Sequence, residues 1–181
     1  MNGDERQILL QVARAALIEE LGGAPAPLWS ELEASPSYGG LFVSLYDGAD
    51  LRGCIGTFAV DGALLGSLAQ IARHAGRDPR FIDRPMTLAD LPRLRVTVSL
   101  LGALERAASP ADFVIGVHGV LIRRALASGC FLPEVAAERG WTVEELLTYC
   151  CAHKAELPPD AWRDPDTHLY RFTTEVLREA T

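Results

Sequence analysis

Residues 41–58 of the chain are LFVSLYDGADLRGCIGTF, and this stretch decides the fold class. An apolar run at 41–46 is followed by the polar turn Asp47-Gly48-Ala49-Asp50, and a second apolar run begins at Leu51. So short a turn joins antiparallel neighbours, because a parallel pair needs a crossover of about a dozen residues or more. We therefore predict a β-hairpin with strands at 41–46 and 51–58.

Apolar residues at helical spacing lie on both sides of this hairpin. Residues 4–21 repeat them every three or four positions and end at Gly22-Gly23, so they predict an amphipathic helix. Residues 63–74 show the same spacing and predict a second helix. Between the first helix and the hairpin, the proline-rich residues 24–40 predict an irregular connection.

The rest of the chain does not alternate strictly between strands and helices. Residues 94–100 alternate apolar with polar side chains, which predicts a strand buried on one face. The patterns further predict helical segments at 87–90, 132–139 and 142–153, strands on both sides of His118-Gly119, and a strand at 169–172 followed by one or two helical turns. This order favours an α+β fold whose largely antiparallel sheet is flanked by helices.

Size and charge restrict the function. The chain has 181 residues, which is enough for a single domain over 1–181 with a proper core. Its 17 basic and 24 acidic residues give a net charge of −7, which argues against duplex nucleic acid as a partner. No apolar run approaches the roughly 18 residues of a membrane span. Residues 1–6 are polar and acidic, unlike a signal peptide, so we expect a cytoplasmic protein.

The cysteine spacing predicts thiols rather than disulfides, metal sites or clusters. Cys54, Cys130, Cys150 and Cys151 show no paired spacing, as expected for free thiols in a reducing compartment. Cys150 and His153 share a helix face, but no second pair completes a zinc site, and no iron–sulfur pattern occurs. The chain has no phosphate-binding loop, dinucleotide fingerprint or hydrolase motif, so we expect neither a cofactor nor a metal.

The hexapeptide Leu51-Arg52-Gly53-Cys54-Ile55-Gly56 is the densest candidate for chemistry. Strand alternation predicts that Arg52 and Cys54 share a face, where a guanidinium would favour the thiolate that a nucleophilic or metal-binding cysteine needs. Gly53 removes a side chain beside Cys54 and permits close approach of a ligand. The alternative is structural, because free cysteines are often buried and glycines mark bulges.

Three further segments are candidates. His118 lies between small residues, where it suits a general base, a hydrogen-bond donor to a ligand, or a structural donor at a turn. Asp78-Pro79-Arg80 is a rigid turn that presents a carboxylate and a guanidinium to a cleft or forms an ordinary ion pair. Glu134 follows Pro133 in the first turn of a predicted helix, where contact with the helix dipole is an adequate role by itself.

The hexapeptide resembles the hallmark of the AMMECR-type domain family, whose bacterial and archaeal members are called AmmeMemoRadiSam system protein A. Other segments resemble further family motifs in the same order, namely Asp78-Pro79-Arg80-Phe81, 96–101, Gly116-Val117-His118-Gly119, 132–136, Gly140-Trp141 and 154–158. The family usually continues Asp-Pro-Arg-Phe with prolines, whereas Ile82-Asp83-Arg84 intervene here before Pro85. The rim of any cleft is therefore expected to differ at these residues.

The resemblance implies an AMMECR-type fold, a compact domain with a smaller subdomain and a cleft between the two parts. It also implies association with a radical S-adenosylmethionine enzyme and a Memo-like protein, but it implies no reaction. The family accepts glutamate or glutamine at the position of Glu134, which favours ligand hydrogen bonding there over proton transfer.

One hypothesis for the function is an enzyme or an enzyme subunit. Cys54 is then a nucleophile or covalent carrier, and Arg52 stabilises its thiolate or an anionic substrate. His118 is the candidate proton acceptor, and Glu134 is a further candidate for the catalytic site. Cys54 is expected to react faster than Cys150 and Cys151, which lie on a predicted helix.

The alternative is a non-catalytic ligand-binding or adaptor domain. Arg52, Gly53, Asp78 and Arg80 then hold a peptide segment or a small anion without turnover. In either case a buried Arg52 needs a partner, for which Glu134 and Asp78 are the candidates. Because the chain lacks a cofactor fingerprint and a complete catalytic set, we expect it to act inside an assembly.

Overall fold

The computed structural model describes residues 3–27, 38–60 and 63–180. The chain divides into two compact units, each with its own sheet and helices. The first unit comprises residues 1–100 and 175–181, and the second comprises residues 101–174. The second unit corresponds to the smaller subdomain expected from the sequence, whereas the cleft expected between the subdomains stays a prediction.

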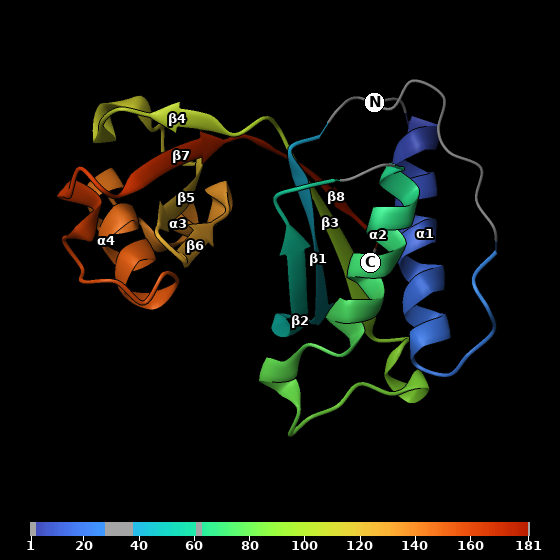
Figure 1. The fold of residues 1–181 in the computed structure, drawn as a ribbon. Helices are drawn as coiled ribbons and strands as arrows, with labels where there is room; N and C mark the ends of the chain where they lie inside the picture. Colours follow the sequence, from blue (N-terminus) through green and yellow to red (C-terminus); the bar gives the residue numbers. More distant parts are fainter. Residues whose placement is uncertain (1–2, 28–37, 61–62, 181) are drawn as a thin grey trace. The chain divides into compact units, whose positions relative to one another are not determined.

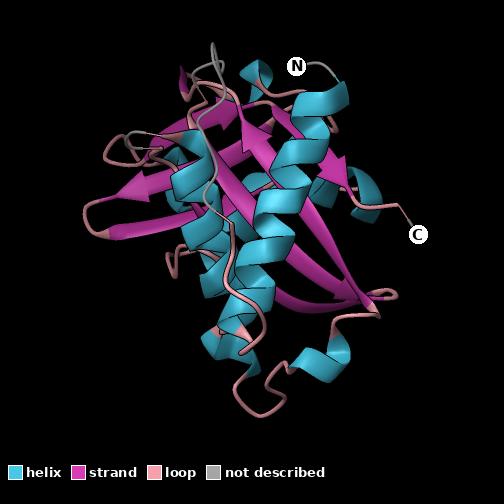
Figure 2. Cartoon of the chain, turned by 90° about the vertical axis from the view of Figure 1, so that its right-hand side faces the viewer, coloured by secondary structure: helices cyan, strands magenta, loops and turns pink. Residues whose placement is uncertain are grey.

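The first unit is a four-stranded sheet with two helices on one face (Figures 1 and 2). Its strands are β1 (Gly40–Asp47), β2 (Asp50–Thr57), β3 (Leu94–Leu101) and β8 (Thr174–Arg178), in the order β2-β1-β3-β8. The helices α1 (Gly3–Glu20) and α2 (Leu64–Gly76) lie side by side. The predicted hairpin and both predicted helices are confirmed.

The core of the first unit lies between this sheet and the helices. The pattern of buried residues follows from two periodicities. Side chains on one face of a helix recur every three or four residues, and side chains on one face of a strand recur every second residue. The fully buried side chains of α1 are Leu9, Val12, Ala13, Ala16 and Leu17, and those of β1 are Leu41, Val43 and Leu45. Leu65, Leu68 and Ala72 of α2 complete the same cluster. The chain leaves α1 through Gly22, whose φ of +92° suits glycine.

β3 is buried on both faces, so the prediction of a single buried face is wrong. Thr97 and Ser99, two of the three polar positions of its alternation, are 7% and 2% exposed, and Arg95 near the start of the strand is half-buried. The strand lies inside the sheet, between β1 and β8. Small hydroxyl side chains are tolerated in such positions, so alternating polarity alone does not report exposure.

The second unit contains the other four-stranded sheet, with the strand order β4-β7-β5-β6 and antiparallel pairing throughout. The strands are β4 (Glu105–Ala107), β5 (Gly119–Arg124), β6 (Ala127–Phe131) and β7 (His168–Phe172). The helices α3 (Pro133–Arg139) and α4 (Val143–His153) pack against β5, and Thr142 caps α4 as its sequence predicts. The core joins Val120 and Ile122 of β5 to Leu146, Leu147 and Cys150 of α4.

Two predicted elements differ from the structure. No strand lies directly before His118, because the chain turns at residues 113–118, where Gly116 has a φ of +80° and the N–H groups of Val117 and His118 both donate to the Val114 carbonyl. The chain after Phe172 forms β8 rather than helical turns, because this segment continues the sheet beside β3. The first correction reflects local hydrogen bonds, whereas the second depends on pairing with a distant strand.

Short 3-10 helices complete the described structure. They are η1 (Pro79–Phe81), η2 (Leu88–Asp90), η3 (Pro110–Asp112) and η4 (Ala161–Arg163). η2 carries the predicted capping box of Thr87 and Asp90. Residues 28–37 of the predicted irregular connection lie outside the described residues. The fold class is therefore α+β, as predicted, but with two antiparallel sheets in place of one.

Candidate functional site

A β-bulge interrupts the hexapeptide at Arg52. Cys54 pairs with Ser44 and Gly53 with Leu45, but the next pair is Tyr46 with Leu51, so Arg52 is the extra residue of β2. Side chains alternate between the two faces only where the register is regular. The alternation that predicts a shared face for Arg52 and Cys54 therefore does not hold through this position.

Gly53 shows on which side of the sheet each neighbour lies. A Cβ atom at Gly53 would lie 2.2 Å from the carbonyl oxygen of Ala75, the penultimate residue of α2, and 3.3 Å from Cε of Met86. Arg52 lines a pocket with Met86 on this same side, whereas Cys54 is paired with Ser44. The prediction that Arg52 and Cys54 share a face is wrong. Gly53 serves close packing against α2, which leaves no room there for a ligand.

Arg52 is buried, with only 6% of its surface exposed. Its Nη2 donates to the carbonyl oxygen of Arg84 at 3.3 Å, and its Nη1 lies 3.8 Å from Oδ2 of Asp47. Its Nε has no hydrogen-bond partner among the described residues. The carboxylate beside Arg52 is thus Asp47 rather than either predicted partner, Glu134 or Asp78, and Asp78 pairs with Arg80 instead.

Asp78 and Arg80 contact the backbone of Cys54 at the edge of the first sheet. The N–H of Cys54 donates to Oδ2 of Asp78 at 2.8 Å, and Nη2 of Arg80 donates to the Cys54 carbonyl oxygen at 2.7 Å. Nη2 and Nε of Arg80 also donate to the Asp78 carboxylate, at 2.6 and 3.0 Å. The predicted ion pair is confirmed, and it supplies the hydrogen bonds that a neighbouring strand would make.

The Asp78 carboxylate is held in its charged form. Burial raises the pKa of Asp78, but hydrogen bonds from the Arg80 side chain and from the Cys54 and Arg80 backbone outweigh it and lower the pKa overall. The hydrogen bond with Asp78 correspondingly raises the pKa of Arg80. The pair therefore stays ionised near neutral pH and is suited to structure rather than to proton transfer.

The four cysteines are free thiols in different surroundings. Cys54 is half-buried, and its Sγ accepts a hydrogen bond from Oγ of Ser44 at 3.3 Å. Cys150 and Cys151 are fully buried, and burial raises the pKa of both thiols. The thiolate is the reactive form of cysteine. The expected order of reactivity, with Cys54 first, stays a prediction.

His118 and Glu134 belong to the second unit. Nδ1 of His118 accepts the N–H of Val114 at 3.0 Å and closes the turn before β5, so this ring nitrogen is already occupied. Glu134 is half-buried in the first turn of α3, and it makes no hydrogen bond or ion pair among the residues described. Their convergence with Cys54 on one site stays a prediction.

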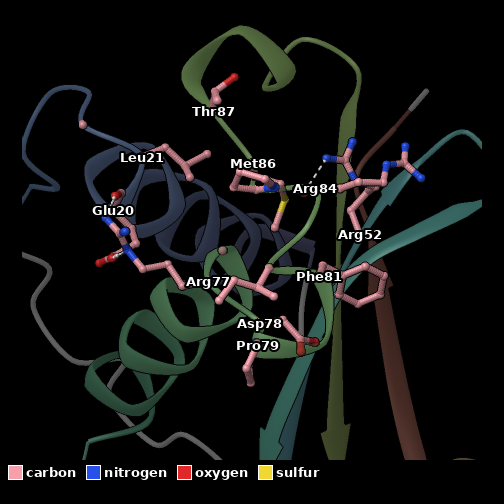
Figure 3. A pocket seen from close by; sticks show the side chains of 14 residues that line it. Glu20, Leu21, Arg52, Arg77, Asp78, Pro79, Phe81, Arg84, Met86 and Thr87 are labelled. Carbon is pink, nitrogen blue, oxygen red and sulfur yellow. Dashed lines mark hydrogen bonds and ion pairs between the residues drawn. The ribbon is translucent and has the colours of Figure 1, made fainter.

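A pocket of about 580 Å³ lies in the first unit, and Arg52 is one of its lining residues (Figure 3). It is enclosed by the C-terminal ends of α1 and α2 and by the segment that follows α2. Its lining residues are Glu20, Leu21, Gly22, Arg52, 76–79, Phe81, Ile82 and 84–87. Sequence reasoning singled out Arg52 and Asp78 but missed the remainder, although Ile82 and Arg84 belong to the segment that departs from the family pattern.

The charges around the pocket are unevenly compensated. Arg77 pairs with the carboxylate of Glu20 and also donates to the Glu20 carbonyl at 2.9 Å, and Asp78 pairs with Arg80. The exposed guanidinium of Arg84 has no ion pair in the described part of the chain. Arg52 and Arg84 lie together at one end (Figure 3). That end is positive in a protein whose net charge is −7.

Residues 3–27, 38–60 and 63–180 contain neither a candidate metal cluster nor a candidate membrane-spanning helix. No three His, Cys, Asp or Glu side chains in these ranges gather as metal ligands would. None of the helices there has the length and hydropathy needed to cross a bilayer.

Comparison with known proteins identifies the family. A protein of Methanothermobacter thermautotrophicus is 37% identical over 188 residues, covering 99% of this chain and 96% of that protein. Protein MJ0810 of Methanocaldococcus jannaschii is 34% identical, with coverage of 97% and 90%. The crystal structure of the uncharacterized protein PH0010 from Pyrococcus horikoshii matches with a TM-score of 0.86 at 31% identity, covering 99% of this chain and 93% of that one. The AMMECR1 family model matches residues 10–177, and the chain therefore belongs to the AMMECR1 family.

Proposed function

We propose that this chain is a non-catalytic binding component of the AmmeMemoRadiSam system, and that its first unit holds a small anionic ligand at Arg52. The observation that carries the proposal is the burial and incomplete charge compensation of the Arg52 guanidinium. This guanidinium is buried in the wall of a pocket, and its charge is met by only one long hydrogen bond and one distant carboxylate among the described residues. An anion would compensate this charge.

Energetics supports a ligand at this position. A buried cation is costly unless it is paired and hydrogen-bonded, and an unsatisfied buried donor costs about 1–3 kcal/mol. The Asp47 carboxylate is 3.8 Å away and also pairs with Arg93, so it compensates Arg52 only in part. Arginine binds carboxylates and phosphates well because its planar fork donates two parallel hydrogen bonds.

Binding is better supported than cysteine catalysis. A nucleophilic cysteine needs a base within hydrogen-bond reach, whereas the thiol of Cys54 contacts the hydroxyl of Ser44. Nδ1 of His118 is engaged by the Val114 N–H. Asp78 and Arg80 are committed to the backbone of Cys54. The Arg80 guanidinium also interacts with the Cys54 side chain, but none of these contacts supplies a base for the thiol.

The partners we propose are those that the family resemblance implies. We propose that the ligand is passed to, or received from, the radical S-adenosylmethionine enzyme and the Memo-like protein of the system. We expect the purified chain to be colourless and metal-free and to co-purify with one of these proteins. Robust turnover of a small substrate by this chain alone would instead favour the cysteine enzyme.

The side-chain Nε–H resonance of Arg52 tests the binding site, because an anion that contacts the rest of the guanidinium changes the environment of this buried group. Sodium acetate, sodium phosphate and sodium 4-phenylbutyrate are titrated into the ¹⁵N-labelled protein at constant ionic strength. We expect at least one of them to shift the Arg52 signal saturably and to leave the signal of Arg178, an exposed residue of β8, unchanged. The absence of a saturable shift with all three anions would overturn the proposed function.

A further inference from the structure

The pocket lined by Arg52 has an apolar interior as well as a positive end. Leu21, Phe81 and Met86 contribute apolar side chains to its wall, and Pro79 and Pro85 extend that surface. Ile82 is also part of the lining and is 77% exposed, which is unusual for an isoleucine. Ligand pockets typically combine such apolar walls with a few polar groups that fix orientation.

The polar groups are separated along the pocket. Figure 3 places Arg52 and Arg84 at one end and Arg77 with Glu20 at the other. The guanidinium of Arg77 is neutralised by Glu20, and the Asp78 carboxylate by Arg80. One end therefore offers positive charge that Asp47 compensates only in part, and the remaining length offers apolar contact.

The helix dipoles restrict the charge of the ligand. α1 ends at Glu20 and α2 ends at Gly76, and both of these residues line the pocket. The C-terminal end of an α-helix carries about half a negative charge, which disfavours a multiply charged anion nearby. Phosphate groups are typically bound at helix N-termini, and neither α1 nor α2 presents its N-terminus here.

We infer that the ligand of this pocket is a monocarboxylate with an apolar body. Its carboxylate lies against Arg52 and Arg84, and its apolar body extends along Leu21, Phe81 and Met86 towards the exposed Ile82. This inference rests on the proposed function, because it specifies the ligand of the same site. A volume of about 580 Å³ accommodates a molecule well beyond the size of acetate.

Isothermal titration calorimetry with four probes tests the ligand class. The probes are sodium 4-phenylbutyrate, its neutral amide 4-phenylbutyramide, sodium acetate and inorganic phosphate. We expect 4-phenylbutyrate to bind at least about tenfold more tightly than each of the other three, because only it offers both the charge and the apolar body. In Arg52→Gln its affinity should fall by about ten- to a hundredfold, as for a lost charged hydrogen bond.

Exposed residues provide variants that do not endanger folding. Arg84→Gln and Ile82→Ser should each weaken 4-phenylbutyrate binding, and only Arg84→Gln should reduce its preference over the amide. Arg178→Gln, which removes an exposed arginine elsewhere in the first unit, should leave the affinity unchanged.

The outcomes separate the two proposals. Arg52-dependent binding of acetate or phosphate with affinity equal to that of 4-phenylbutyrate would overturn the ligand class and leave the proposed function standing. If the amide binds as tightly as the acid, the inferred ligand class is overturned. The proposed function then stands if an anion still shifts the Arg52 Nε–H signal. No binding of any anion would overturn both.

Discussion

The carboxylate of Asp78 accepts the backbone N–H of Cys54 at 2.8 Å, and this contact joins two sequence motifs into one structural element. Arg80, held by the same carboxylate, donates to the carbonyl oxygen of Cys54 at 2.7 Å. β2 is an edge strand, and unpaired edge groups invite pairing with another chain. The Asp-Pro-Arg turn covers this edge at Cys54 and fixes the backbone beside the bulge at Arg52.

Asp78→Asn should destabilise the protein. The amide keeps one acceptor oxygen but loses the charge that serves the N–H of Cys54 and the guanidinium of Arg80 at the same time. We expect the free energy of unfolding to fall by about 1.5–3 kcal/mol, measured by urea denaturation. Asp83→Asn, an exposed change in the same segment, is the matched control. Equal stability of the two variants would contradict the role assigned to Asp78.

The contribution of Asp78 should depend on pH in a defined direction. Its pKa is lower in the folded protein than the ordinary value of 3.8, so the charged form is favoured by folding. The stability it supplies is fully present above pH 3.8 and is lost as the pH falls through the lowered pKa. The difference in unfolding free energy between the wild type and Asp78→Asn should therefore be constant near neutral pH and shrink in acid. A difference that grows in acid would reverse this assignment.

Gly53→Ala should be more damaging than another glycine substitution nearby. The new Cβ would lie 2.2 Å from the Ala75 carbonyl oxygen, so α2 and β2 must separate. We expect a loss of about 1–3 kcal/mol, typical of overpacking. Gly66→Ala in α2 meets nothing within 4 Å and should instead stabilise the helix by about 0.5–1 kcal/mol. Thermal melts of both variants test the pair, and similar melting temperatures would refute the packing role.

Cys54 should be labelled by iodoacetamide before Cys150 and Cys151. It is half-buried, whereas the other two are fully buried and burial raises the pKa of their thiols. Mass spectrometry of peptides over a time course measures the three rates in the native protein, and the rates should converge in urea. In Cys54→Ser the fast-labelled peptide should disappear without loss of folding. Native labelling of Cys150 at the rate of Cys54 would count against the described burial.

The sequence by itself determined the elements whose signals are local. The helical spacing before Gly22, the turn around Gly48 and the capping box of Thr142 depend on contacts within a few residues, and the structure confirms all three. The family follows in the same way, because its motifs are read one after another. Sequence patterns also bring Arg52, Cys54, Asp78 and Arg80 to attention as one group of candidates.

Only the tertiary structure decided which of these residues contact one another. A one-residue shift in strand register separates Arg52 from Cys54, and such a shift depends on the pairing with β1 rather than on the hexapeptide. β8 forms because β3 is beside it, and Leu21 and Arg84 share a pocket because α1 and the segment after α2 meet in space. The register shift, the formation of β8 and the shared pocket have the same physical reason. Pairing and burial are properties of residues far apart in the chain, which local periodicity does not record.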